Sequence, residues 1–553
     1  MARTPEPFLP TRKTRDRSQG PVPTELDVAL VGAGTGSLTA AAYLAQAGLK
    51  VACFDPHYVA GGCATQFARG KRSRRYLFDV GLHYIGDCAP GGHFDRILNP
   101  VGVDIEYVPM DPDGFDVLVF PDRTFKTPAG IDNYEARLLE HFPSEKKAIA
   151  RYMKMLRQVQ GAIDALAPTH GQMNWRLILH VLLRGHLLPF YQGATLATFL
   201  DTCTDNMALR AVLAGSHGDH GLPPSKVSLL HHCGLMLHYL TTGGWYPKGG
   251  GQVMADALAD RIEACDGTVL LQHEVTKIDV ENGRAVGMTV ADRHGNTEQI
   301  QAKAVVSGAD IFLTLDKLLG REHLPAKWNK QRDSWTVPDG VFMTCLAVKD
   351  DLGARDFGRR NYWTFDHHDV EAYYRDNVKD GRPNVQGSYI TSATQKDPDC
   401  DHHAPEGVET LEVMTLLPGD PAVWGLDPDD FTKGDYRKKP EYVARKQRVE
   451  DELVRRLDDL FPGVGQTIEF RESATPITQV RYTRAEGGSG YGLAQTPGQF
   501  GDNRPSWRGP VPGLYLAGMN TRSGHGIAGA LHSGRTAAAI VAKDLGVSLN
   551  PDD

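Results

Sequence analysis

The clearest hydrophobic pattern lies near the amino terminus. Residues 27–44 run from a short apolar segment, through a glycine turn, into an alanine-rich stretch with helical spacing. Gly48 is a helix stop, and residues 50–55 form a second apolar run that ends in an acid. The pattern predicts a parallel β-α-β unit of about thirty residues, as in a nucleotide-binding sheet.

Patterns further along the chain predict more layered structure. Helical patterns cover residues 134–160 and 175–188, and short β-rich runs with Asn-Gly and Gly-Asn turns cover residues 267–308. Residues 513–518 again predict a strand and a turn, followed by a small-residue helix to about Lys543. The expected fold class is α/β, with a Rossmann-like domain joined to an α+β second domain of mixed sheet and helices.

The order of these patterns predicts a nucleotide-binding domain assembled from three segments, residues 26–110, 241–310 and 456–545. The insertions between them, residues 111–240 and 311–455, would form the second domain. Residues 1–25 carry prolines and basic residues without an apolar run, and we interpret them as a disordered tail.

Composition narrows the classes of function. A net charge of −8 over 553 residues, without a strongly basic stretch of domain size, argues against a nucleic-acid partner. The eight cysteines lie far apart without a CxxC pair, so we expect free thiols in a reducing compartment. The histidines near residues 217–232 lack convincing ligand spacing, so we expect no metal. No uncharged apolar run reaches about 18 residues, which predicts a cytoplasmic protein, soluble or peripheral to a membrane.

The first chemical signal is the glycine turn at residues 32–37. Its glycines allow a tight turn and a close approach to a pyrophosphate, which would lie on free N–H groups of the following helix. Asp55 follows 23 residues after Gly32, where a carboxylate can accept hydrogen bonds from an adenosine ribose. The residues predicted to bind a dinucleotide here are Gly32, Gly34, Thr35, Gly36, Ser37 and Asp55.

Further motifs follow in order along the chain. They are Gly61-Gly62 and residues 78–86, 239–251, 305–310, 513–520 and 526–531. The series resembles the FAD-dependent phytoene desaturase, carotenoid isomerase and retinol saturase family, and residues 81–86 fit the retinol saturase branch best. The resemblance extends from about residue 27 to residue 545, which is nearly the whole chain.

The resemblance implies FAD as the cofactor. The glycine pair at residues 61 and 62 would pass close to the ribityl and phosphate groups, and a helix starting near residue 526 would direct its N-terminus at the flavin. The chain departs from the family pattern at Ser37, which replaces a glycine, and at Asn520, which replaces an acid. The further cofactor contacts implied are Gly61, Gly62, Val275, Gly518, Asn520, Gly526, Ile527 and Ala528.

The same resemblance suggests four catalytic candidates. His83 and Tyr84 occupy a family position near the flavin, and Tyr246 follows two glycines where an aromatic ring could line a channel for a flat polyene. Arg481 precedes a glycine-rich run that the family places around its cavity. Each has a structural alternative: a hydrogen-bonded histidine, a packed aromatic ring or a solvated loop.

The implied activity is that of an FAD-dependent oxidoreductase on CH–CH groups of an apolar polyene or isoprenoid lipid. Saturation is favoured, and desaturation or cis–trans isomerisation of a carotenoid-like substrate stays open. Because one dinucleotide fingerprint is visible, electrons would come from NAD(P)H visiting the flavin or from a quinone. A flavin amine oxidase, and a non-catalytic prenyl-lipid carrier of the GDP dissociation inhibitor type, are alternatives.

Two segments predict contact with a membrane surface. Residues 175–188 are rich in large apolar side chains, with Arg176 and Arg184 available to face headgroups, and this run is too short to span a bilayer. Residues 71–75 form a compact basic patch that would favour anionic lipid. A core helix and a solvated loop are the respective alternatives.

Overall fold

The computed structural model describes residues 17, 21–71, 74–166, 175–183, 185, 188–427, 430 and 435–549. The tail predicted at residues 1–25 therefore lies mostly outside the described residues. Arg17 is described and buried, and its guanidinium pairs with Asp260 at 2.7 Å and Glu263 at 2.6 Å.

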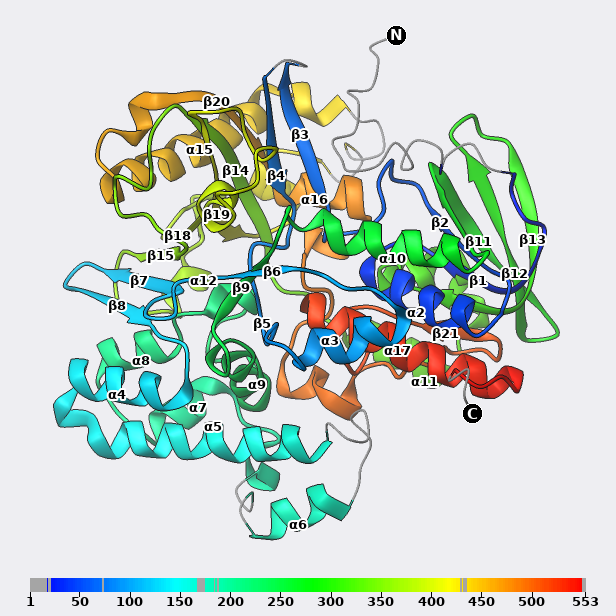
Figure 1. The fold of residues 1–553 in the computed structure, drawn as a ribbon, viewed down its shortest axis with the longest axis horizontal. Coiled ribbons are helices and arrows are strands. Elements are labelled where there is room, and N and C mark those ends of the chain that lie inside the picture. The colour runs from blue at the N-terminus through cyan, green and yellow to red at the C-terminus, as the bar shows by residue number, and fades with distance from the viewer. Residues whose placement is uncertain are drawn as a thin grey trace.

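Within the described residues, seven strands form a first sheet that contains the predicted β-α-β unit (Figure 1). In spatial order, with β21 beside β13, they are β10 (Thr268–Leu271), β2 (Val51–Asp55), β1 (Glu25–Val31), β13 (Thr297–Ser307), β12 (Arg284–Asp292), β11 (His273–Glu281) and β21 (Leu514–Leu516). The ladders of β1 with β2 and β13, of β2 with β10 and of β13 with β21 are parallel, whereas β11, β12 and β13 pair antiparallel. This arrangement confirms the predicted α/β class.

Three helices cover one face of this sheet: α2 (Thr35–Gln46), α10 (Gln252–Ala264) and α17 (Gly526–Leu545). They bury the side chains of β1 that point to this face, Val28 and Leu30, while Ala29 and Val31 pack on the opposite face. Buried alanines at residues 40–42 leave room for α10 and α17 to pack closely against α2. The helix packing thus places the N-termini of α2 and α17 near each other.

A second sheet of seven strands lies beside the first in the described part of the chain (Figure 1). In order they are β20 (Ile468–Ala474), β14 (Gly340–Val348), β19 (Glu409–Leu417), β18 (Gly387–Thr391), β15 (Asn361–Phe365), β7 (Asp116–Phe120) and β8 (Arg123–Thr127). Strand β7 of the first insertion pairs with β15 of the second. The position of β20 differs from the predicted domain division. We assigned residues 456–545 to the nucleotide-binding domain, but β20 pairs with β14 of the second sheet. The change of sheet therefore comes after β20.

Helices from the first insertion lie below the second sheet in Figure 1 and enclose a large apolar core. They are α4 (Ile131–His141), α5 (Lys146–Leu166), α6 (Trp175–Leu183), α7 (Leu196–Asp201), α8 (Met207–Leu213) and α9 (Leu229–Leu240). Helix α6 lies at the lower edge of the molecule, and none of its described residues is buried. The small strands β5 (Ile85–Gly86), β9 (Gly244–Pro247) and β6 (Tyr107–Pro109) form a third sheet.

Candidate functional site

A cavity of about 1580 Å³, the cofactor cavity, opens where β1 turns into α2. It exceeds the ~300–1,000 Å³ of sites for drug-sized ligands, so it has room for a dinucleotide. Segments far apart in the chain meet in its wall. The predicted cofactor residues that line it are Gly32, Gly34, Thr35, Gly36, Asp55, Gly61, Gly62, Val275, Gly518, Gly526 and Ile527.

The N-terminus of α2 offers free donors to this cavity. Its N-cap residue, Gly34, has no side-chain cap, and the first N–H bonded within the helix is that of Leu38, which donates to Gly34 O at 2.9 Å. The N–H groups before it have no partner in the helix, and Thr35 and Gly36 line the cavity. The end of α2 can therefore bind an anionic group such as a pyrophosphate.

Asp55 at the end of β2 fixes the glycine turn from the side. Its Oδ2 accepts from Ala33 N and its Oδ1 from His57 N, both at 2.8 Å. Burial raises the pKa of Asp55, and the two N–H groups oppose that rise. Each carboxylate oxygen has a second lone pair, so Asp55 can still accept a ribose hydroxyl.

The glycines form a cradle that side chains would fill. A Cβ on Gly62, where φ is +61°, would lie 3.1 Å from Gly34 Cα, and one on Gly36 would lie 2.7 Å from Gly518 Cα. With the free N–H groups and Asp55, this bare backbone fits the predicted FAD. Ser37 compensates for the missing glycine, because its Oγ donates to Val31 O at 3.2 Å and occupies the space beside another glycine.

Three predicted cofactor residues do not line the cofactor cavity, and one catalytic candidate does. Ser37 is buried behind it, Asn520 Oδ1 accepts from Leu493 N at 2.9 Å, and Ala528 lines the neighbouring cavity instead. Arg481 on α16 (Pro476–Thr483) lines the cofactor cavity and lies over the ring of Tyr482.

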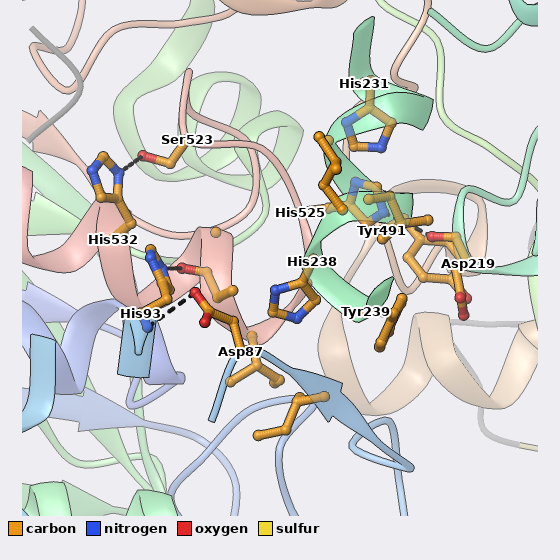
Figure 2. A pocket seen from close by; sticks show the side chains of 18 of the residues that line it. Asp87, His93, Asp219, His231, His238, Tyr239, Tyr491, Ser523, His525 and His532 are labelled. Atoms are coloured by element: carbon orange, nitrogen blue, oxygen red, sulfur yellow. Dashed lines mark hydrogen bonds between the residues drawn. The ribbon is translucent and has the colours of Figure 1, made fainter. Parts of the chain in front are cut away.

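A second cavity of about 1650 Å³, the apolar cavity, lies against the first. The two share Gly81, Tyr491, Gly526 and Ile527 in their walls, so they meet at the start of α17. Figure 2 shows Tyr239, Tyr491 and His525 around the Asp219 side of this cavity. Its wall is rich in aromatic rings, among them Tyr84, Tyr239, Trp363, Tyr374, Tyr389 and Tyr491.

The structure separates the remaining catalytic candidates. His83 and Tyr84 both line the apolar cavity, and the ring of Tyr84 stacks on Tyr239 with centroids 4.4 Å apart. Burial lowers the pKa of His83 to about 3, so its imidazole is neutral at pH 7. Tyr246 was expected to line a channel, but it is fully buried, donates to Asp79 and lines neither cavity.

A hydrogen-bonded trio in the apolar cavity was missed by the sequence analysis. Tyr84 Oη lies 2.8 Å from Asp219 Oδ2 and 3.0 Å from Asp116 Oδ2. Burial, then repulsion from Asp116, raises the pKa of Asp219 to about 8, and burial raises that of Asp116 to about 6. The sequence places the three residues more than thirty positions apart, so no local pattern joins them.

A buried ionic network lies behind this trio. Lys396 is 1% exposed, donates to Thr391 Oγ1 at 2.7 Å and to the backbone oxygen of His83, and lies 4.5 Å from the ring centroid of Tyr246. Burial lowers the pKa of Lys396 to about 8, and nearby carboxylates, Glu412 foremost, oppose that shift. The network explains the buried position of Tyr246.

Two clusters of ionisable side chains stand out in the described residues. His220, His231 and His525 have nitrogens within 4.8 Å of one another, but His525 already bonds to Gln495 and to Asp219 O, and we assign no metal there. Asp397, Cys400 and His403 form the second cluster, in which His403 Nε2 lies 3.4 Å from the carboxylate.

Comparisons with known proteins agree with this geometry. A family model described as an NAD(P)-binding Rossmann-like domain matches residues 30–100, and one described as a flavin-containing amine oxidoreductase matches residues 431–542. An all-trans-retinol 13,14-reductase from Danio rerio is 27% identical over 94% of this chain and 86% of its own. A chloroplastic prolycopene isomerase from Daucus carota is 26% identical over 95% and 81%.

A solved structure shares the fold. Wild-type putrescine oxidase bound to putrescine matches with a TM-score of 0.59 at 16% identity and covers 94% of this chain and 99% of its own. Among the described residues, no helix has the length and hydropathy needed to cross a membrane. These matches give the non-catalytic carrier alternative no support. The chain is an FAD-dependent oxidoreductase, and its homologues include all-trans-retinol 13,14-reductases and prolycopene isomerases.

Proposed function

We propose that the protein reduces a carbon–carbon double bond of a long apolar polyene that lies in the apolar cavity. One observation carries the proposal: the large aromatic cavity meets the cofactor cavity at Tyr491, Gly526 and Ile527. A ligand there would have one bond beside the reactive part of the cofactor and the rest of its chain among aromatic rings.

The chain's residues would hold the two ligands in distinct ways. The N–H groups at the start of α2 and the carboxylate of Asp55 would bind the cofactor, and Gly61 and Gly62 would let it lie close to the backbone. When bound and reduced, FAD supplies a hydride. The stacked rings of Tyr84 and Tyr239 would orient a flat conjugated chain and exclude water from it.

The relatives favour a polyene over an amine as substrate. Both named relatives align with more than nine-tenths of this chain, and one is named for reduction of retinol and the other for isomerisation of prolycopene. We place reduction first, in keeping with the predicted branch. Isomerisation is the second candidate, and the carotenoid-related match is the observation that favours it.

We further propose that the substrate enters from a membrane surface beside α6. The exposed side chains there include Trp175 at 68%, Leu182 at 72% and Leu183 at 69%. Leu177 on the same helix and Ile163 on α5 line the apolar cavity, so the exposed helix is continuous with the cavity wall. An apolar polyene could therefore pass from a bilayer into the cavity with little exposure to water. Arg184 and residues 72–73 of the predicted basic patch lie outside the described residues.

The test begins with the absorption spectrum of the purified protein. Bound flavin should bleach under anaerobic conditions with NADPH, or with a reduced quinone if NADPH fails, and all-trans-retinol should restore the oxidised bands. The product should contain two more hydrogen atoms than retinol, while a fully saturated alcohol of the same length should leave the flavin bleached. A product of unchanged mass but altered geometry would favour isomerisation, and an amine that alone reduces the flavin would contradict both.

A further inference from the structure

The trio of Tyr84, Asp116 and Asp219 contains one more acceptor than its phenol can satisfy. A tyrosine hydroxyl has one proton to donate, yet carboxyl oxygens lie 2.8 Å and 3.0 Å from Tyr84 Oη. If both carboxyls were ionised, the phenol could donate to only one of them, and the other carboxylate oxygen would face the phenol oxygen with no proton between them. One of the two carboxyls must therefore carry a proton and donate it to the phenol oxygen.

The surroundings show which carboxyl is protonated. Asp116 Oδ1 accepts from Asn361 Nδ2 at 3.1 Å, and Thr391 Oγ1, which donates to Asn361 Oδ1 at 2.8 Å, is bonded in turn by the Lys396 ammonium. These donors favour the ionised form of Asp116. The side chain of Asp219 hydrogen-bonds to Tyr84, and burial followed by the charge of Asp116 raises the pKa of Asp219 to about 8. At pH 7 the proton therefore belongs mainly to Asp219.

Asp219 is also the carboxyl placed to reach a substrate. It lines the apolar cavity, and its backbone oxygen is 2.8 Å from His525 Nε2. His525 caps α17 immediately before Gly526, where the apolar and cofactor cavities meet. This contact fixes the position of the Asp219 backbone relative to the cofactor side of the cavity.

We propose that Asp219 is the catalytic acid that protonates the substrate double bond, and that Tyr84 positions it and returns its proton; this inference rests on the proposed reduction. The Asp219 O–H bond breaks as a C–H bond forms at one alkene carbon, and the other carbon takes the hydride that the reduced cofactor supplies. The alkene thus gains two electrons, one hydride and one proton. Asp219 becomes a carboxylate and regains a proton from solvent water, relayed through Tyr84, which ends the cycle with its own proton restored.

The alternatives in the same wall serve less well as acids. The imidazole of His83 is neutral at pH 7 because burial lowers its pKa to about 3. Burial and the charges of Asp116 and Asp219 raise the pKa of Tyr84 well above its usual value, so a free tyrosinate beside them would be costly. Tyr84 can therefore pass a proton on but is a poor final donor.

The pH dependence follows from the groups around the carboxyl. The ionisable groups near Asp219 that come from other elements are Tyr84, Asp116, Tyr239, Tyr374, Tyr389, Tyr491 and His525. His217 and His220 flank Asp219 on its own short helix. None of them is a cation at pH 7, since burial lowers the pKa of His217 to about 3 and that of His525 to about 4. An acid must be protonated to act, so substrate reduction should be present below pH 8 and lost as pH rises through about 8.

Infrared spectroscopy of the purified protein tests the proton without any substrate. Because burial also raises the pKa of Glu412 to about 8, the Asp219 band is read as a difference: the wild type at pH 7 should show a carbonyl band of a protonated carboxylic acid that is lost above pH 8 and is missing from Asp219→Asn. It should persist in Asp116→Asn and in the control Asp205→Asn, which alters an exposed carboxylate before α8. A band that survives in Asp219→Asn and vanishes in Asp116→Asn would place the proton on the wrong residue and overturn the proposal.

Rapid-mixing kinetics test the role of that proton. Asp219→Asn should bind flavin and be bleached by reductant like the wild type, but its reoxidation by polyene should slow by at least about 100-fold. Because Asp219 donates its proton to the phenol oxygen, Tyr84→Phe removes a partner of the protonated acid and should move the high-pH limb of reoxidation downward. Unchanged reoxidation in Asp219→Asn refutes the acid role alone. A bleached wild type that no polyene reoxidises refutes the proposed function instead, while the infrared band still locates the proton.

Discussion

The exposed face of α6 allows a quantitative test of membrane attachment. In the double variant Leu182→Ser, Leu183→Ser, two side chains that are 72% and 69% exposed lose their apolar surface. Full burial of one leucine is worth about 1.5–3 kcal/mol, so transfer of these exposed portions into a bilayer is worth about 3 kcal/mol for the pair. Since each 1.4 kcal/mol corresponds to about tenfold, partition onto neutral vesicles should fall by about 100-fold.

Flotation with phosphatidylcholine vesicles measures this partition directly. The control is Met207→Ser on α8, which removes a side chain that is 47% exposed away from α6 and should partition like the wild type. The double variant should keep its flavin spectrum and should reduce a polyene delivered in detergent at the wild-type rate. Equal partition of the wild type and the double variant would refute the membrane role of α6.

Three further outcomes follow from the site. Asp55→Ala should leave the N–H groups it binds without an acceptor and weaken FAD binding by about 1–3 kcal/mol, measured by flavin release on dilution; unchanged retention would contradict its role. Gly36→Val should abolish FAD retention, because its Cβ would meet backbone at 2.7 Å, whereas Gly193→Ala, with open space around it, should retain the cofactor. Although burial opposes it, the neighbouring histidines lower the pKa of Cys400 to about 6. A disulfide reagent should therefore modify Cys400 before the other cysteines, faster as pH rises through about 6, and His403→Gln should remove this advantage; uniform thiol reactivity would disprove it.

The cofactor cavity was predictable because its signals are local. Residues 32–37 and Asp55 belong to one β-α-β unit, so the chain itself fixes their spacing, and the structure places all of them except Ala33 and Ser37 in the cavity wall. Asn520 shows where such reasoning fails. Asn520 follows Met519, which lines the cofactor cavity, but its own side chain accepts a hydrogen bond from the backbone N–H of Leu493. Leu493 lies on a separate loop, so the sequence near Asn520 does not reveal this contact.

The parts that could not be predicted depend on contacts between distant segments. Tyr84 directly precedes β5, Asp116 begins β7 and Asp219 ends a short helix at residues 217–219. Their common hydrogen bonds exist only after these three segments have packed together. Tyr246 was assigned to a channel from its flanking glycines, but its side chain instead reaches a buried carboxylate. For the same reason nothing local assigns β20 to β14, since its partner strand lies more than a hundred residues earlier.

The protonation of Asp219 also bears on the direction of the reaction. Reduction of an alkene consumes a proton at carbon, desaturation releases one, and isomerisation needs no net proton. A carboxyl whose pKa burial raises to about 8 is an acid at pH 7 and becomes a base only above that pH. The same cavity should therefore favour saturation near neutrality, and any desaturation should increase as pH rises through about 8. The rates of saturation and of desaturation, each measured at pH 7 and pH 9, decide the point. An isomerase would show neither the loss of saturation nor the gain of desaturation as pH rises.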